Sequence, residues 1–295
     1  MKKIAPLLQT VVCLIVIVLF PGCNKLDSTA ASTTDEVVPC QVRQMIYPPL
    51  TPEDLAKART VMQINPEAAA AAVAYNDTAV FTYNALGNPV SIIHQRDIGE
   101  DNLFFKYDHA NRLTDFIIAY ANAAADGGDQ WHRYSYDPHN TTRIVADTDY
   151  ISYETENGII TSYDGIELTT FAYDAKDRIS KTTEIVLADD IDDTVITAYT
   201  YDSRGNLVAS GAAYDNKINI HRTNKMWMFL DRDYSVNNPV DNGTDTYDAE
   251  NLPVTIATNS SAQVAGFDFM VIGYPNGQTN VTVSYSCEYN GQQYH

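Results

Sequence analysis

The chain has 295 residues, of which 45% are hydrophobic, and it contains 20 tyrosines, 9 phenylalanines and 2 tryptophans. This is enough apolar material for the core of one large domain or two small ones, and too much for a disordered chain. The net charge of -19 argues against nucleic acid and anionic lipid headgroups as partners, because both would be repelled. The many tyrosines and the few leucines and lysines favour β-sheet.

The N-terminus is typical of an export signal. Lysines at positions 2 and 3 precede an apolar run over residues 11–20, which is too short for a membrane-spanning helix. Residues 19–23, Leu-Phe-Pro-Gly-Cys, resemble a bacterial lipobox. We therefore expect residues 1–22 to be a lipoprotein signal peptide and Cys23 to carry a lipid that anchors the protein in the membrane. Ordinary signal cleavage is the alternative, because Phe20 and Pro21 depart from the usual lipobox residues.

Two segments precede the main domain. Residues 26–38 are rich in Ser, Thr and Asp, so we expect residues 23–50 to form a flexible tether that starts at the lipidated cysteine. Residues 51–76 contain two typical helix starts, Thr-Pro-Glu-Asp at position 51 and Asn-Pro-Glu at position 65. We predict one or two short helices, over residues 52–63 and 66–74, packed on one end of a sheet or, alternatively, bound to a partner.

Cys40 and Cys287 are the two cysteines that remain once Cys13 leaves with the signal and Cys23 is acylated. The last strand, over residues 281–289, alternates apolar and polar side chains, and Cys287 lies on its apolar face. Export to an oxidising compartment permits a disulfide. A bridge between Cys40 and Cys287 would tie the start of the domain to its last strand, and two buried free thiols are the alternative.

One short pattern occurs six times between residues 81 and 254. Each copy has a Tyr, which in five of the six copies is preceded two positions earlier by an aromatic residue and in the sixth by Asp245. The Tyr is usually followed by Asp or Asn, then by Gly or Asn at the fourth place of the turn, and then by Leu, Ile or Val. The two rings share one face of a strand, the Asp or Asn starts a turn, and Gly or Asn supplies the positive φ that closes it. Each copy therefore predicts a β-hairpin. The six scaffold tyrosines are Tyr83, Tyr107, Tyr136, Tyr173, Tyr201 and Tyr247.

The spacing between these tyrosines varies from 24 to 46 residues. Variable spacing argues against the identical rungs of a solenoid and favours consecutive hairpins. We predict a mainly all-β domain over residues 77–295, built as a large curved antiparallel sheet or a barrel-like array of about a dozen strands. The outward positions are polar, which argues against a pore-forming barrel with a lipid-facing band.

The Tyr-Asp-x-x-Gly-Asn-Leu copy at residues 201–207 resembles the YD repeats of RHS-type proteins. The layout of residues 79–289 is similar to that of secreted Bacteroidetes lipoproteins that carry such repeats in a domain of unknown function with a porin-like fold. This resemblance implies a fold and a surface but no activity. RHS toxins end in a separate toxin domain, whereas hairpin-like sequence here runs to the last residues, so we expect no toxic cargo.

Residues 214–239 combine cationic and aromatic side chains between the fifth and sixth copies. A long loop of this composition is typical of a site for a glycan or peptide, and it is our candidate binding loop. Alternatively, the Trp-Met-Phe-Leu run at residues 227–230 plugs one end of the sheet while the cations balance nearby acids. The candidate binding residues are Lys217, His221, Arg222, Trp227, Phe229, Arg232 and Tyr234.

The sequence has no HExxH, GxSxG, CxxC, Walker or dinucleotide-binding motif. The six histidines lack metal-ligand spacing, and the acidic run around residues 189–193 lacks EF-hand spacing, so we expect neither a metal nor a cofactor. A pair of glycosidase carboxylates, in contrast, leaves no signature in a chain with 38 acidic residues.

These observations predict a non-enzymatic lipoprotein of the outer membrane that faces the cell surface or the periplasm and binds a glycan or protein partner. A carbohydrate-active enzyme that uses scattered Asp or Glu is the second hypothesis. A structural component of an envelope assembly is the third. Two close acids beside Trp or Tyr on the concave face of the sheet would favour the enzyme.

Overall fold

The computed structural model describes residues 37–49, 76–95, 101–119, 127–188, 191–208, 213–240, 245–256, 271–272, 280–289 and 292–294. The predicted signal peptide, the lipidated Cys23, most of the tether and both predicted N-terminal helices lie outside these residues. Among the residues described, no helix is both long enough and apolar enough to cross a membrane.

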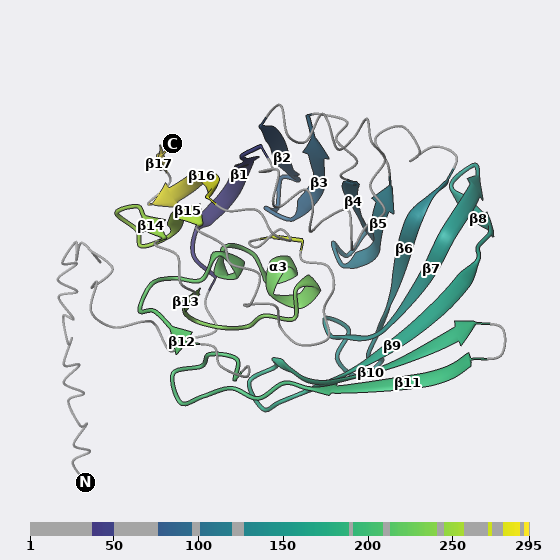
Figure 1. Cartoon of the computed structure of the whole chain (residues 1–295). Helices are drawn as coiled ribbons and strands as arrows, with labels where there is room; N and C mark the ends of the chain where they lie inside the picture. The colour runs from purple at the N-terminus through teal and green to yellow at the C-terminus, as the bar shows by residue number, and fades with distance from the viewer. Residues whose placement is uncertain are drawn as a thin grey trace, which may run out of the picture. The chain divides into compact units, whose positions relative to one another are not determined.

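Consecutive antiparallel hairpins build one 15-stranded sheet (Figure 1), which confirms the predicted fold class. The strands are β1 (Cys40–Tyr47), β2 (Asp77–Tyr83), β3 (Pro89–His94), β4 (Asn102–Tyr107), β5 (Leu113–Ala119), β6 (Gly127–Tyr136), β7 (Ile144–Glu156), β8 (Ile159–Ser162), β9 (Gly165–Tyr173), β10 (Ile179–Ala188), β11 (Ile191–Ala198), β12 (Ala213–Tyr214), β13 (Pro239–Val240), β14 (Thr246–Tyr247), β15 (Pro253–Ile256), β16 (Val281–Tyr289) and β17 (Gln292–Tyr294). The main order is β11-β10-β9-β7-β6-β5-β4-β3-β2-β1-β16-β15-β14, and β12 and β13 form a separate pair.

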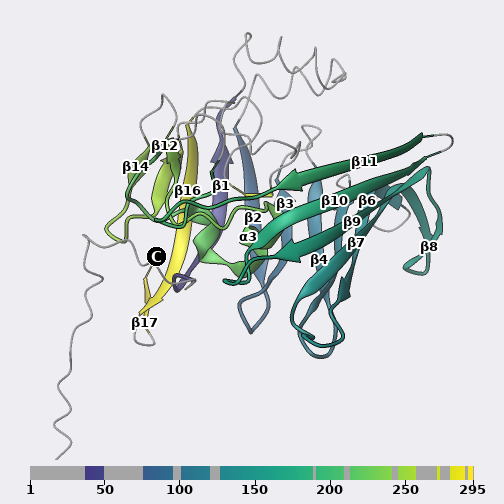
Figure 2. The same cartoon turned by 90° about the horizontal axis from the view of Figure 1, so that it is seen from below.

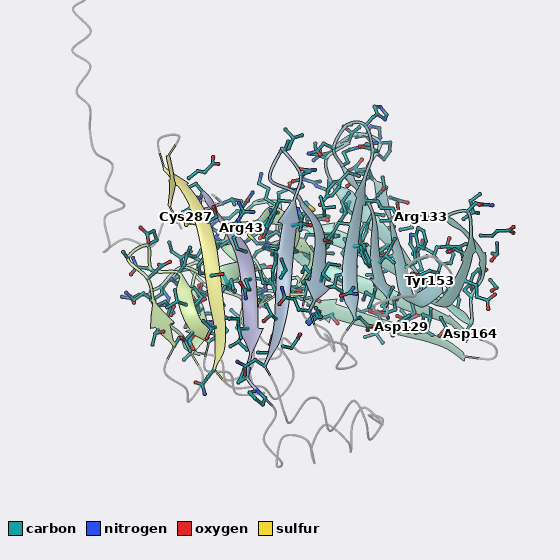
Figure 3. All side chains as sticks on the ribbon, turned by 90° about the horizontal axis from the view of Figure 1, so that it is seen from above. Arg43, Asp129, Arg133, Tyr153, Asp164 and Cys287 are labelled. Atoms are coloured by element: carbon teal, nitrogen blue, oxygen red, sulfur yellow. A yellow bond between two sulfur atoms is a disulfide. The ribbon has the colours of Figure 1, made fainter. Side chains whose placement is uncertain are left out.

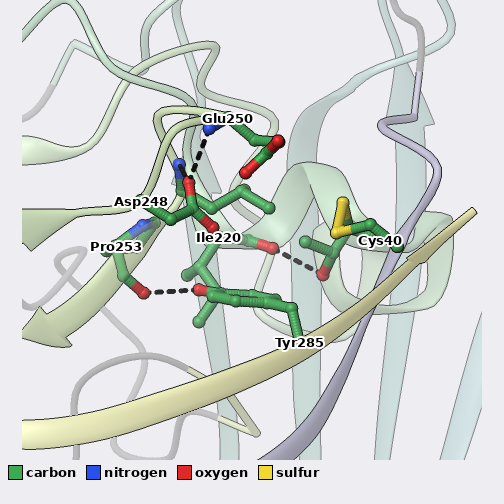
Figure 4. Close-up of a disulfide and its surroundings, with 9 residues drawn as sticks. Cys40, Ile220, Asp248, Glu250, Pro253 and Tyr285 are labelled. Atoms are coloured by element: carbon green, nitrogen blue, oxygen red, sulfur yellow. Dashed lines mark hydrogen bonds between the residues drawn. A yellow bond between two sulfur atoms is a disulfide. The ribbon is translucent and has the colours of Figure 1, made fainter. Parts of the chain in front are cut away.

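β1 joins the first hairpins to the last ones. It pairs antiparallel with β2 on one side and with β16 on the other, and the register places Cys40 opposite Cys287. Their sulfur atoms form a disulfide across a sequence separation of 247 (Figure 4). The predicted bridge is confirmed, and the alternative of two free thiols is ruled out.

The turns of the repeats share one hydrogen-bond pattern. In the second copy, the Asp108 carboxylate accepts the backbone N–H groups of Ala110 and Arg112. Asn111, at the fourth place of the turn, has a φ of 60°. The residue at this place also has a positive φ in four further copies, so the predicted turn conformation is confirmed there. These residues are Gly87, Asp177, Gly205 and Asn251.

The repeat tyrosines connect neighbouring hairpins. The Tyr107 hydroxyl donates to the backbone oxygen of Pro89 at 2.8 Å, and the Arg112 guanidinium lies 4.8 Å from the centroid of the Tyr136 ring. In the second to fifth copies the hydroxyl reaches a strand of the preceding hairpin, so each of these copies is fixed to the one before it, and in the first copy it reaches β1. The equivalent pairs are Tyr83 with Val42, Tyr136 with Leu113, Tyr173 with Ile144 and Tyr201 with Ile179. Tyr247 instead donates to the Asp215 carboxylate.

A short helix, α3 (Lys225–Leu230), packs against one face of the sheet. The Trp227 ring meets Phe81 of β2 edge-on, and the Phe229 ring meets Tyr134 of β6 in the same way. Because one helix contacts strands this far apart in the strand order, the sheet curves around it (Figures 1 and 2). We call the side that faces α3 the inner face.

A smaller apolar cluster lies on the opposite, outer face. Trp131 and Tyr153 are buried there with two residues of β5, and the Lys106 ammonium lies 4.1 Å from the centroid of a Trp131 ring. Figure 3 labels Tyr153 together with Arg133, whose guanidinium is 5.7 Å from the same Trp131 ring. The outer face is therefore not polar throughout, because β5, β6 and β7 carry this cluster.

Candidate functional site

The predicted binding loop, residues 214–239, contributes to the interior. His221 and Trp227 are 0% exposed, and Arg222 and Phe229 are also buried. Ligand contact with these four side chains would require α3 and its flanking residues to move. The structure thus places these four residues of the candidate binding loop in the interior, and the interpretation in which residues 227–230 plug one end of the sheet agrees with their burial.

Lys217, Arg232 and Tyr234 are only partly buried. The Lys217 ammonium donates to the side-chain oxygen of Asn251 at 2.6 Å, which braces the turn of the sixth repeat. The Arg232 guanidinium lies 5.9 Å from the centroid of the Phe171 ring. Arg232 thus borders the inner face at β9, where its charge acts on His132 and Tyr134 of β6.

A buried hydrogen-bond network stabilises the position of residues 227–230, which we call the plug. His221 Nε2 lies 2.8 Å from Asp231 Oδ2, and His221 Nδ1 lies 2.7 Å from Asn219 Oδ1. Asp231 also accepts the backbone N–H groups of Val271 and Ile272. Burial alone would lower the pKa of His221, but the hydrogen bond and charge of Asp231 outweigh it and raise this pKa. Both side chains are 0% exposed, so the network is structural.

Acidic side chains gather on the inner face of β6 to β10, where the sequence motifs gave no sign of a site. The register places His132 of β6 opposite Asp149 of β7, and Asp149 opposite Glu167 of β9. Asp147 lies two residues before Asp149 on β7, and both Asp147 and Glu184 of β10 are opposite Thr169 of β9. Residues that are opposite or two apart share a face. We call these five residues the acidic row.

His132 lies between the two aspartates of the row. Its Nδ1 is 2.9 Å from Asp147 Oδ2, and its Nε2 is 3.9 Å from Asp149 Oδ2. The remaining oxygen of each aspartate, Oδ1, is buried and has no hydrogen-bond partner among the described residues. Buried carboxylate oxygens normally have a partner. Two buried acceptors on the inner face are therefore unsatisfied by the residues that the structure describes.

Burial and mutual repulsion change the pKa values of the row. Burial raises the pKa of Asp149 to about 6, and the charges of Asp147 and Glu167 add to this effect. Burial also raises the pKa of Glu167, with a further contribution from Glu184. Desolvation alone would lower the pKa of His132, but Asp147 and Asp149 outweigh it and raise this pKa to about 9. At neutral pH the row therefore combines an imidazolium with several carboxylates.

The free energy of unfolding is expected to fall as the pH rises from about 6.5 to about 9. His132 has a higher pKa when folded, so its stabilising contribution is complete below pH 6.5 and is lost as the pH passes through 9. The groups that face it are Tyr134, Asp147, Asp149, Glu167 and Arg232. The loss amounts to at most about 3 kcal/mol.

Urea unfolding over this pH range measures the effect. The variant His132→Gln lacks the titrating group and should show a flatter profile than the wild type. A decline of the same size in the variant would show that other groups cause it.

The acidic row has the chemistry to bind a cation or to transfer a proton. Asp147 and Asp149 are two positions apart on β7, and Tyr134 lies opposite Asp147 in the register. A carboxyl group with a pKa near 6, such as that of Asp149, suits a general acid. In the part of the chain that the structure describes, no group of three His, Cys, Asp or Glu side chains could hold a metal ion.

No family model matches the chain, and no curated protein matches it. Among solved structures, the crystal structure of TcdB2-TccC3-TEV is similar over 49% of this chain and 8% of that chain, with 13% sequence identity and a TM-score of 0.27. The chain thus spans a small part of that protein's length. The similarity is distant and assigns no family.

Proposed function

We propose that the chain is a lipoprotein anchored in the outer membrane by acylated Cys23, and that its β domain binds a partner without catalysing a reaction. The Cys40–Cys287 disulfide is the main support, because stable disulfides form in exported proteins and are rare in the cytosol. The lipobox at residues 19–23 would supply the anchor. The hairpin repeats suit a secreted Bacteroidetes-type lipoprotein with YD repeats.

The acidic row supports the binding role. Asp147 and Asp149 each keep a buried oxygen without a partner in the described residues. An unsatisfied buried acceptor destabilises a fold by about 1–3 kcal/mol, and a bound ligand that donates a hydrogen bond would offset this cost. The hairpin repeats then act as a rigid scaffold that holds the row.

Metabolic labelling with a palmitate analogue tests the anchor. The wild type should incorporate the label and fractionate with the outer membrane, whereas Cys23→Ala should do neither. Cys13→Ala leaves both the lipobox and the disulfide intact, so it is the matched control and should retain the label. Incorporation of the label by Cys23→Ala would contradict the proposed anchor.

Protease treatment of intact cells, with a periplasmic protein as control, then distinguishes the two sides of the outer membrane. Digestion of the β domain would place it on the cell surface, where a glycan or protein partner is accessible. Protection would place it in the periplasm. A structural role in an envelope assembly would show instead as co-purification with a fixed partner and no soluble ligand.

A carbohydrate-active enzyme is the second candidate, because Asp147, Asp149 and Tyr134 lie together on the inner face. In this scheme Asp149 donates a proton to the leaving oxygen while a second carboxylate stabilises the positive charge of the sugar. A glycan panel is incubated with the wild type and with Asp149→Asn. Turnover that falls by about 100-fold in the variant would establish the enzyme. The non-enzymatic proposal expects no turnover by either protein.

A further inference from the structure

We propose that the acidic row binds an organic ammonium group, held between the Oδ1 atoms of Asp147 and Asp149. The inference rests on the binding role proposed above and names the chemistry of the ligand. A lysine side chain of a peptide, an amino sugar and a polyamine all carry this group.

Two acceptors on the inner face lack a donor among the described residues. The side chains of Asp147 and Asp149 are 10% and 7% exposed, and their Oδ2 atoms face His132. Their Oδ1 atoms have no hydrogen-bond partner in the described part of the chain. Because buried carboxylate oxygens are ordinarily satisfied, these two atoms are the acceptors that the proposed ligand would satisfy.

The charge of the row favours a cationic ligand. His132 and Arg232 bring two positive charges close to the aspartates of the row, and two glutamates extend it. Four carboxylates therefore face two cations on this part of the inner face. The chain as a whole has a net charge of -19, so it also attracts a cation over longer distances and repels an anion.

The arrangement of the open oxygens suits an ammonium group better than a guanidinium or a metal ion. An ammonium has three divergent donors on one compact charge, so it can donate to two separate carboxylates. A guanidinium fits best on both oxygens of one carboxylate, and here His132 already faces one oxygen of each aspartate. A metal ion would need at least three suitably placed ligands, and the described residues contain no such group.

The row opens toward the end of the sheet. Asp147 and Asp149 are buried, Glu167 and Glu184 are partly buried, and Val195 of β11, which lies opposite Glu184, is 49% exposed. β11 is the last strand in the order. Side-chain exposure along the row thus increases from β7 toward β11, so a ligand that reaches the buried Oδ1 atoms would enter from the β10 and β11 side.

Aromatic rings border the buried end. Tyr134 lies opposite Asp147, and the Phe229 ring of α3 packs edge-on against Tyr134 with centroids 5.4 Å apart. The face of an aromatic ring attracts an ammonium group. The same rings offer an apolar surface to the carbon atoms next to it.

Isothermal titration calorimetry with the purified full chain tests the inference. The probes are Nα-acetyl-lysine amide, glucosamine and spermidine, one for each source of the ammonium group. Each probe is paired with its N-acetylated form, which has a similar shape but lacks the charge. We expect saturable binding of at least one free amine and an affinity at least about tenfold lower for its acetylated form.

Two variants locate the binding site. Asp149→Asn removes one open acceptor and one charge, and it should weaken binding by about tenfold. Asp164→Asn removes the same charge from an exposed bend before β9 and should leave the affinity unchanged. Glu184→Gln, at the partly buried end of the row, should weaken binding by about threefold, and it keeps the test valid if Asp149→Asn does not fold.

The possible outcomes separate this inference from the proposed lipoprotein. Equal binding of free and acetylated probes, or wild-type affinity in both row variants, would overturn the ammonium site. So would the absence of binding by all three amines, and palmitate labelling at Cys23 would then leave the anchor proposal standing. Tighter binding of Nα-acetyl-arginine amide than of any amine would overturn the choice of ammonium. The tightest amine identifies the source.

Discussion

Removal of the Cys40–Cys287 disulfide is expected to lower the free energy of unfolding by about 5 kcal/mol. The bridge closes a loop with a sequence separation of 247, and a cross-link over so long a loop restricts the unfolded chain strongly in the chain-entropy account. It also lies in the pairing of β1 with β16, which joins the first hairpins to the last ones. Reduction should therefore loosen the whole domain, and not only its ends.

Urea unfolding of the wild type and of the double variant Cys40→Ala/Cys287→Ala measures this effect. Reductant should shift the unfolding midpoint of the wild type and leave that of the double variant unchanged, which controls for other effects of the reductant. A difference below about 1 kcal/mol between the two proteins would mean that strand pairing alone holds β1 on β16.

The repeat hairpins could be predicted from the sequence because their determinants are local. An Asp such as Asp108 accepts backbone N–H groups two and four residues later, and the residue at the fourth place is left-handed. The third copy shows how much variation this design tolerates. Its turn is longer, with the N–H of Asp137 bonded to the backbone oxygen of Arg143, yet Tyr136 still donates to Leu113.

One long-range feature, the pairing of β1 with β16, could also be predicted from the sequence. Only Cys40 and Cys287 remain for a bridge in an exported domain, and Cys287 lies in a clearly alternating strand. The bridge requires the two strands to be neighbours, and the register places the two cysteines opposite each other. The ability of the two cysteines to form a disulfide, and not the strand propensity of their neighbours, made this contact predictable.

The acidic row could not be predicted, because it depends on register across four strands. Asp147 and Asp149 alternate with Thr148 and Tyr150 along β7, so either set fits a solvent-facing side. Only the pairing with β6, where His132 lies opposite Asp149, places the acids on the inner face. The burial of residues 227–230 could not be predicted for a similar reason, because it depends on how the sheet curves around α3.

The variant Asp231→Ala is expected to lower the free energy of unfolding by about 3–5 kcal/mol. Asp231 accepts hydrogen bonds from the backbone of Val271 and Ile272 and pairs with His221 at 2.8 Å. Alanine would leave these donors without an acceptor at a site that is 0% exposed. The network also positions α3, so the loss should spread to the contacts of Trp227 and Phe229 with the sheet.

Thermal and urea unfolding of three further variants separate charge from shape at this site. Asp231→Asn keeps the shape and one acceptor, so it should cost less than Asp231→Ala, and Asp164→Asn should stay within about 0.5 kcal/mol of the wild type. The double variant His221→Phe/Asp231→Leu replaces the buried pair by apolar groups and should cost less than the sum of its single changes, because neither partner is left unpaired. If Asp231→Ala matched the stability of the wild type, the network would not be what holds the plug against the sheet.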